Sequence, residues 1–115
     1  MGIKFVKAKD RTWFEMDKGV QICRDVSSDV SSTMGFSIGE FENCRMDWTV
    51  LYDEYLYCVE GTITLETDEG DFVLERGDGI WLPDGTHVIY KAEEKSTCIA
   101  AIYPANWREI HGYEV

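Results

Sequence analysis

The most informative part of the chain begins with Tyr-Asp-Glu-Tyr-Leu-Tyr-Cys-Val-Glu-Gly at residues 52–61 and ends with Gly-Asp-Gly-Ile-Trp-Leu-Pro-Asp-Gly-Thr-His at residues 77–87. Each segment contains branched or aromatic residues, which favour β-strands, and glycines, which favour turns. The interval between them carries Asp-Glu-Gly-Asp at residues 68–71, a typical hairpin turn. This part of the chain therefore predicts antiparallel strands connected by tight turns.

The rest of the sequence continues the same pattern, with turn signals about every eight to twelve residues. A weak alternation covers residues 3–8, and only residues 104–111, after a proline, favour a helix. The remaining expected strands cover residues 20–26, 34–41, 48–59, 62–67, 72–75, 80–82, 87–92 and 97–103. The chain is predicted to be all-β with one short C-terminal helix.

The two segments at residues 52–61 and 77–87 resemble the double motif of the cupins. The resemblance implies an RmlC-like antiparallel β-barrel, or jelly roll, and a single domain over residues 1–115 with its core motifs at 34–107. Metal-binding cupins carry His-x-His three or four residues before the glutamate that Glu54 matches. Trp48 and Val50, or Asp47 and Thr49 at the longer spacing, stand there instead. The usual metal ligands of the superfamily are therefore missing.

Strand periodicity assigns candidate residues to the interior of this barrel, because alternate side chains share a face. If Glu54 points inward, its neighbours at even positions do so as well. On the later strand, His87 and Ile89 share one face, and we expect that face to be the inner one. The predicted catalytic residues are Glu54, Tyr52 and His87. The predicted pocket residues are Trp48, Val50, Leu56, Cys58 and Ile89.

Longer matches extend the resemblance to one family, that of ethanolamine-utilisation protein Q. They comprise Met34-Gly35-Phe36, the string from Trp48 to Glu54, Val59-Glu60-Gly61, the string from Pro83 to His87, and Tyr103-Pro104-Ala105-Asn106-Trp107. The resemblance implies a bacterial homodimer associated with microcompartments and an acetate kinase activity that uses Mg²⁺ and ATP on a small carboxylate. Many members have a longer N-terminal region, so microcompartment targeting of this chain does not follow from the resemblance.

Three functions remain open from the residues alone. Phosphoryl transfer needs cations near the transferred group, and no Gly-x-x-x-x-Gly-Lys-Ser/Thr loop is present. Alternatively, Glu54 and His87, with Tyr52 as a third ligand, hold a divalent transition metal for lyase, isomerase or dioxygenase chemistry. The same Glu54 and His87 can instead simply hydrogen-bond each other. The third function is a non-catalytic module that binds a small molecule between apolar walls.

Composition and charge exclude nucleic acid and a membrane as partners. Lysine and arginine total 11 against 22 acidic residues, a net charge of −11, so the surface repels nucleic acid. No apolar run is long enough to span a bilayer, and we expect a cytoplasmic protein with four reduced cysteines. Tyr55, Tyr57 and Trp81 are predicted to point outward and to form a homodimer interface. Trp107 is predicted to serve packing or an interface and not the pocket.

Overall fold

The structure is a computed structural model that describes residues 2–113. Its strands are β1 (Phe14–Asp17), β2 (Val20–Val26), β3 (Gly35–Phe41), β4 (Cys44–Thr49), β5 (Asp53–Glu60), β6 (Thr62–Thr67), β7 (Gly70–Glu75), β8 (Gly79–Leu82), β9 (His87–Ala92) and β10 (Ser96–Tyr103). A 3₁₀ turn, η1 (Ala8–Asp10), precedes them, and the helix α1 (Trp107–Ile110) follows. The prediction of an all-β chain with a short C-terminal helix is confirmed.

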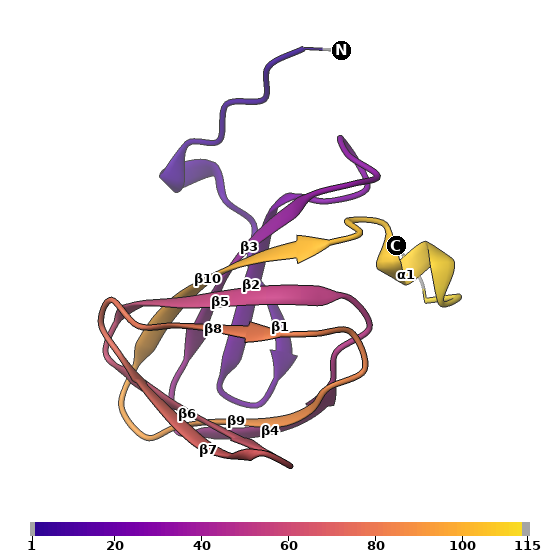
Figure 1. The fold of residues 1–115 in the computed structure, drawn as a ribbon. Helices are drawn as coiled ribbons and strands as arrows, with labels where there is room; N and C mark the ends of the chain where they lie inside the picture. The colour runs from indigo at the N-terminus through magenta and orange to yellow at the C-terminus, as the bar shows by residue number, and fades with distance from the viewer. Residues whose placement is uncertain (1, 114–115) are drawn as a thin grey trace.

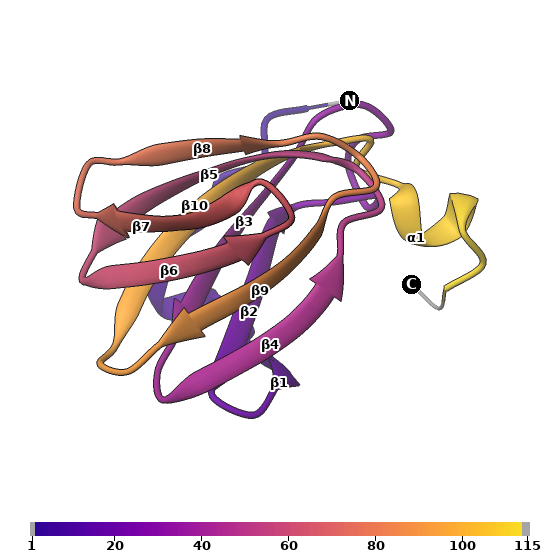
Figure 2. The ribbon, with the colours of Figure 1, turned by 60° about the horizontal axis from the view of Figure 1, so that its bottom comes forward.

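The strands form two antiparallel sheets that face each other (Figures 1 and 2). One sheet has six strands in the order β1-β2-β3-β10-β5-β8, and the other has four in the order β4-β9-β6-β7. Helix α1 lies at one end of the two sheets (Figure 2). None of the described helices has the length and apolar character needed to cross a membrane.

Three expected strands, β2, β6 and β9, have the bounds that the sequence predicts. The single strand expected over residues 48–59 is wrong, because β4 ends at Thr49 and the chain crosses to the other sheet before β5. Val50 holds this crossing: its amide donates to the Thr86 carbonyl at 3.0 Å, and its carbonyl accepts from the Gly85 amide at 2.8 Å. Residues 3–8 do not form a strand.

The core lies between the sheets, and both sheets contribute fully buried side chains. Val20 comes from the six-stranded sheet, whereas Ile63, Leu65 and Val88 come from the four-stranded sheet. This burial is the main driving force for pairing the sheets. Because both inner faces are apolar, any polar side chain that points inward needs a partner or a ligand.

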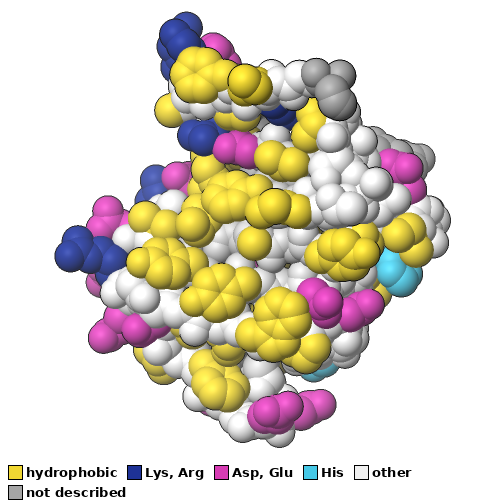
Figure 3. Space-filling model, turned by 45° about the horizontal axis from the view of Figure 1, so that its top comes forward, with side chains coloured by type: hydrophobic (Ala, Val, Ile, Leu, Met, Phe, Trp, Pro, Cys, Tyr) yellow, Lys and Arg dark blue, Asp and Glu magenta, His cyan; other side chains and the backbone are white. Residues whose placement is uncertain are grey.

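The outer face of the six-stranded sheet is unusually apolar. Tyr55, Tyr57 and Trp81 are exposed there, as the strand alternation predicts. Tyr55 lies beside Trp81 on β8 and beside Ala101 on β10, which makes a continuous row across three strands. Figure 3 looks onto this face, where hydrophobic side chains form a nearly continuous band. Patches of this kind commonly mark a protein–protein interface.

We expect this face to form the interface of a homodimer. Sedimentation equilibrium at micromolar concentration is predicted to show a dimer, and Trp81→Glu is predicted to give a monomer because it places a charge in the apolar row. Phe72→Glu is the matched control, since Phe72 is an exposed aromatic residue on β7 of the other sheet. A wild-type monomer would contradict the prediction.

Candidate functional site

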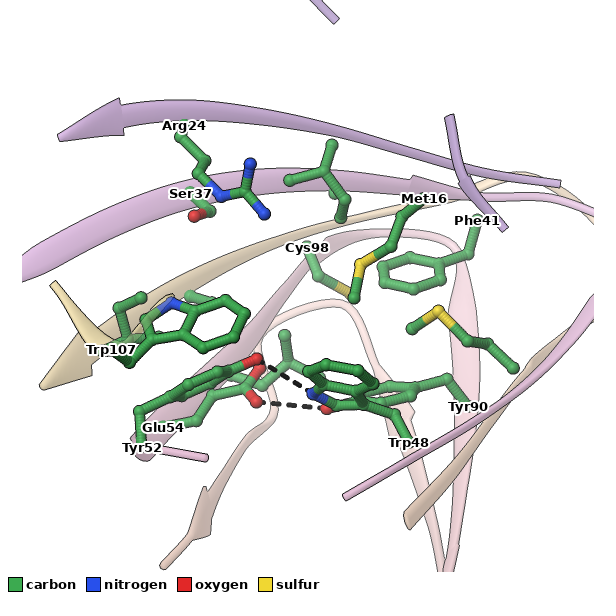
Figure 4. A pocket seen from close by; sticks show the side chains of 16 residues that line it. Met16, Arg24, Ser37, Phe41, Trp48, Tyr52, Glu54, Tyr90, Cys98 and Trp107 are labelled. Atoms are coloured by element: carbon green, nitrogen blue, oxygen red, sulfur yellow. Dashed lines mark hydrogen bonds between the residues drawn. The ribbon is translucent and has the colours of Figure 1, made fainter. Parts of the chain in front are cut away.

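A cavity of about 70 Å³ lies inside the barrel, between the two sheets (Figure 4). Its walls are mostly apolar and come from both sheets and from helix α1. The apolar lining includes Met16, Ile22, Phe41, Met46, Leu56 and Ile102. A few polar groups interrupt this lining in two separate places, which is the usual composition of a small-ligand site.

Glu54 is the only acidic residue that lines the cavity among residues 2–113. It points inward from β5, only 5% exposed, and its Oε1 accepts a hydrogen bond of 3.1 Å from the Tyr90 hydroxyl on β9. Burial raises the pKa of Glu54 from 4.5 to about 7, although the Tyr90 hydrogen bond acts in the opposite direction. A carboxyl group with this pKa changes its charge near neutral pH, which suits proton transfer or charge control.

Tyr52 lies beside Glu54, in the crossing between the sheets. Its hydroxyl accepts a 3.1 Å hydrogen bond from Nε1 of Trp48, and its ring lies 4.9 Å from the ring of Trp107. Burial raises the pKa of Tyr52, and the charge of Glu54 raises it further. Tyr52 therefore keeps its proton. Within residues 2–113, no hydrogen bond from the Tyr52 hydroxyl to an acceptor is formed, so that proton is available to a ligand.

Arg24 and Ser37 line another part of the cavity, as Figure 4 shows, although their strands β2 and β3 belong to the same sheet as β5 with Glu54. Arg24 on β2 is directly opposite Ser37 on β3 in the strand register, and both side chains line the cavity. The guanidinium carbon of Arg24 lies 4.3 Å from the centre of the Phe14 ring. Burial lowers the pKa of Arg24 to about 10, and the nearby charge of Arg108 lowers it further. Arg24 nevertheless stays charged at neutral pH.

The placement of His87 corrects the sequence-based prediction. Val88 and Tyr90 are buried, so His87 and Ile89 lie on the outer face of β9 and not in the pocket. The side chain of His87 is 44% exposed, and its Nε2 lies 2.6 Å from an oxygen of Asp47. His87, Ile89 and Lys91 share the outer face, whereas Val88, Tyr90 and Ala92 share the buried face, so the polarity of the two faces already indicates which one is inner.

A metal site made by Glu54 and His87 is therefore wrong, as is the alternative hydrogen bond between them. Within the described part of the chain, no group of three histidine, cysteine, aspartate or glutamate side chains is placed to hold a metal ion. Because protein sites for transition metals usually need three such ligands, these residues do not supply the usual ligand set of a resident Zn²⁺, Fe²⁺ or Mn²⁺.

Among the other predicted pocket residues, Trp48 and Leu56 line the cavity together with Tyr52 and Glu54. Val50 and Cys58 are fully buried in the core, but they do not line the cavity. Trp107 is a correction of the opposite kind, because it lines the cavity although only a packing or interface role was expected.

Sequence reasoning also missed Arg24, Ser37 and Tyr90. Arg24 did leave a signal, since Val20, Ile22 and Arg24 alternate along β2 and share one face. A charged residue that continues an apolar face is unusual unless the charge is used. Tyr90 left no comparable signal, because its partner Glu54 is distant in the sequence and belongs to the other sheet.

The high pKa of Glu54 predicts a measurable effect of pH on stability. The folded state binds this proton more tightly than the unfolded state does, so the stabilising contribution is complete below pH 4.5 and is lost as pH rises to about 7. We expect Glu54 to lower the free energy of unfolding by about 2 kcal/mol between about pH 5 and pH 8. Glu54→Gln removes this titration.

Urea unfolding of the wild type and Glu54→Gln across this pH range measures the effect. The stability of the variant relative to the wild type is predicted to increase as pH rises. Glu60→Gln is the matched control, because Glu60 is an exposed carboxylate at the end of the same strand. A difference between wild type and Glu54→Gln that stays constant with pH would contradict the prediction.

Comparison with known proteins agrees with this architecture. The structure is similar to ethanolamine utilization protein Q of Salmonella typhimurium LT2, with a TM-score of 0.73 and 21% identity over 81% of this chain and 80% of that one. It is also similar to an RmlC-like cupin of Shewanella frigidimarina NCIMB 400, with a TM-score of 0.77 and 15% identity over 90% of this chain and 93% of that one. These two likenesses establish a cupin fold.

Sequence comparison identifies the family. The chain is 29% identical over 77 residues to a Clostridioides difficile (strain 630) protein named acetate kinase EutQ. The match covers 67% of this chain and 49% of that protein, so the chain spans about half the length of this relative. The family described as ethanolamine utilisation protein EutQ matches residues 1–109. The chain therefore belongs to the EutQ family and has the fold of an RmlC-like cupin.

Proposed function

We propose that this chain binds a small carboxylate inside the barrel and carries an acetate kinase-like activity that serves ethanolamine utilisation. The observation that carries the proposal is the cavity of about 70 Å³ inside the barrel, with the titratable Glu54 on its wall. A space of this size accepts a molecule of a few heavy atoms. The names of curated relatives, acetate kinase EutQ, supply the reaction.

In the proposed reaction, a carboxylate oxygen attacks the γ-phosphorus of Mg·ATP. The bond from that phosphorus to the bridging oxygen breaks, and ADP leaves with an acyl phosphate as the other product. The cavity is too small for a nucleotide, so Mg·ATP must approach from outside as a substrate. Catalysis of phosphoryl transfer is mainly electrostatic, and Arg24 with the nearby Arg108 supplies positive charge on one side of the cavity.

Glu54 controls the charge of the site in this proposal. When it is protonated, the cavity has no negative group of its own and accepts an anionic substrate. When Glu54 ionises, two negative charges share a small space of low dielectric constant, which disfavours binding. Tyr52 keeps its proton throughout and offers an O–H donor at the same wall.

Activity is therefore predicted to depend on the protonation of Glu54. Purified protein with Mg·ATP and acetate is expected to form acetyl phosphate, which hydroxylamine traps as a hydroxamate. The KM for acetate is predicted to rise above pH 7, approaching about tenfold per pH unit, the limit for one ionising group. Glu54→Gln is expected to remain active and to lose this pH dependence, because glutamine resembles the neutral acid.

The exposed Glu60 again provides the control, and Glu60→Gln is expected to keep the wild-type pH profile. An unchanged pH dependence in Glu54→Gln would remove Glu54 from this role. If acetate stabilises the folded protein but no acetyl phosphate forms, the cavity is a binding site without phosphoryl transfer. The lack of a phosphate-binding loop in the sequence favours that second function.

A further inference from the structure

We propose that Arg24 and Ser37 form an anion-binding subsite, so that the cavity selects short carboxylates with an apolar tail and rejects cationic amines such as ethanolamine. The inference deepens the proposed function, because it concerns the same cavity. It assigns the charge of the ligand and the wall that recognises it, and it does not depend on phosphoryl transfer.

The first support is the lack of a partner for Arg24. It points into an apolar cavity from β2, yet within residues 2–113 no carboxylate forms an ion pair with it. Arg11, which lies before β1 and contacts Asp25 on the other face of β2, provides the contrast. Its Nε and Nη2 both donate to the carboxylate of Asp25, at 2.9 and 2.8 Å. The fold thus supplies a carboxylate for one half-buried guanidinium and leaves the other for a ligand.

The second support is the position of Ser37. The strand register places it directly opposite Arg24, on the neighbouring strand and on the same wall. Among the described residues its hydroxyl makes no hydrogen bond to another side chain or to a backbone group. A guanidinium beside a free hydroxyl offers several donors converging on one place, and a carboxylate accepts such donors well.

The third support is the packing of Arg24 on an aromatic ring. Its guanidinium carbon lies 4.3 Å from the centre of the Phe14 ring on β1. Stacking on an aromatic ring stabilises a guanidinium without using its N–H donors. Arg24 is therefore held in place while its donors remain available to the cavity.

Charge determines which ligand this arrangement accepts. The only acidic residue in the described lining is Glu54, on β5 of the same sheet, where burial favours its neutral form (Figure 4). Arg108 adds a second positive charge near Arg24. A monoanion therefore reduces the unbalanced charge of the cavity, whereas an ammonium group increases it.

The apolar residues of the cavity lining define the rest of the ligand. Ile22, Phe41 and Met46 line the cavity and offer no charged group. A short alkyl chain fits this surface, and the volume of about 70 Å³ limits its length. The ligand class is therefore a small aliphatic monocarboxylate, with its carboxylate at Arg24 and Ser37.

The test compares ligands of nearly equal shape and different charge. Binding of propionate, propionamide and ethanolamine to the wild type is measured by isothermal titration calorimetry at neutral pH. We expect propionate to bind at least about tenfold more tightly than propionamide, because one charged hydrogen-bonding group accounts for a difference of this size. Ethanolamine is expected not to bind. Arg24→Gln is expected to abolish the preference, and Arg24→Lys to retain part of it.

Ser37→Ala is expected to weaken propionate binding by about three- to tenfold, the effect of one hydrogen bond. The matched control is Arg76→Gln, which makes the same charge change at an exposed arginine outside the cavity and should leave binding unchanged. Urea unfolding accompanies each variant. Arg24→Gln is expected to be at least as stable as the wild type, because it removes a half-buried charge without a protein partner.

Equal binding of propionate and propionamide to the wild type would overturn the subsite, as would a preference that survives in folded Arg24→Gln. Tighter binding of ethanolamine than of propionate would overturn it as well. The proposed kinase activity can be rejected independently of the subsite. If propionate binds through Arg24 but acetate and Mg·ATP give no acetyl phosphate, the subsite stands and phosphoryl transfer is rejected. If acetyl phosphate forms without any charge preference, phosphoryl transfer stands and the subsite is rejected.

Discussion

The hydrogen bond from the Tyr90 hydroxyl to Glu54 joins the two sheets across the cavity, and the site depends on it. A buried carboxyl group without a partner is costly, so one that persists in an apolar core needs such a donor. One hydrogen bond satisfies Glu54 only in part, and burial keeps its pKa near 7. The fold therefore tolerates Glu54 in its neutral and in its charged form. A bound ligand can change which of the two forms is populated.

The second feature of the site is the separation of its polar groups along the cavity, because strand β10 lies between β3 and β5 in the sheet. Arg24 and Ser37 belong to β2 and β3, whereas Glu54 and Tyr90 belong to β5 and β9 (Figure 4). The guanidinium and the carboxyl group do not form an ion pair with each other, and apolar side chains lie between them. If Arg24 and Glu54 did form an ion pair, it would be a structural salt bridge. Groups held apart in a cavity leave room for a ligand and determine its charge.

Much of the fold could be predicted because alternation and turn residues are local. The bounds of β2, β6 and β9 agree with the sequence pattern, since each alternates or ends at a clear turn. The run over residues 48–59 could not be divided, because its residues favour strands throughout and the crossing depends on bonds from Val50 to Thr86 and Gly85. Hydrogen bonds between segments so far apart are not visible in local preferences.

The sequence on its own was sufficient to establish the all-β class and the absence of the usual histidine pair before Glu54, and it predicted that Glu54 and Tyr52 share one face. The polarity of β9 indicates its inner face, but the contact of Tyr90 with Glu54 depended on the pairing of β9 with β4 and β6, which also left His87 outside. The partnership of Arg24 with Ser37 likewise depended on the register of β2 against β3. A shift of one residue in strand register moves every side chain to the other face, so these assignments belong to the assembled barrel.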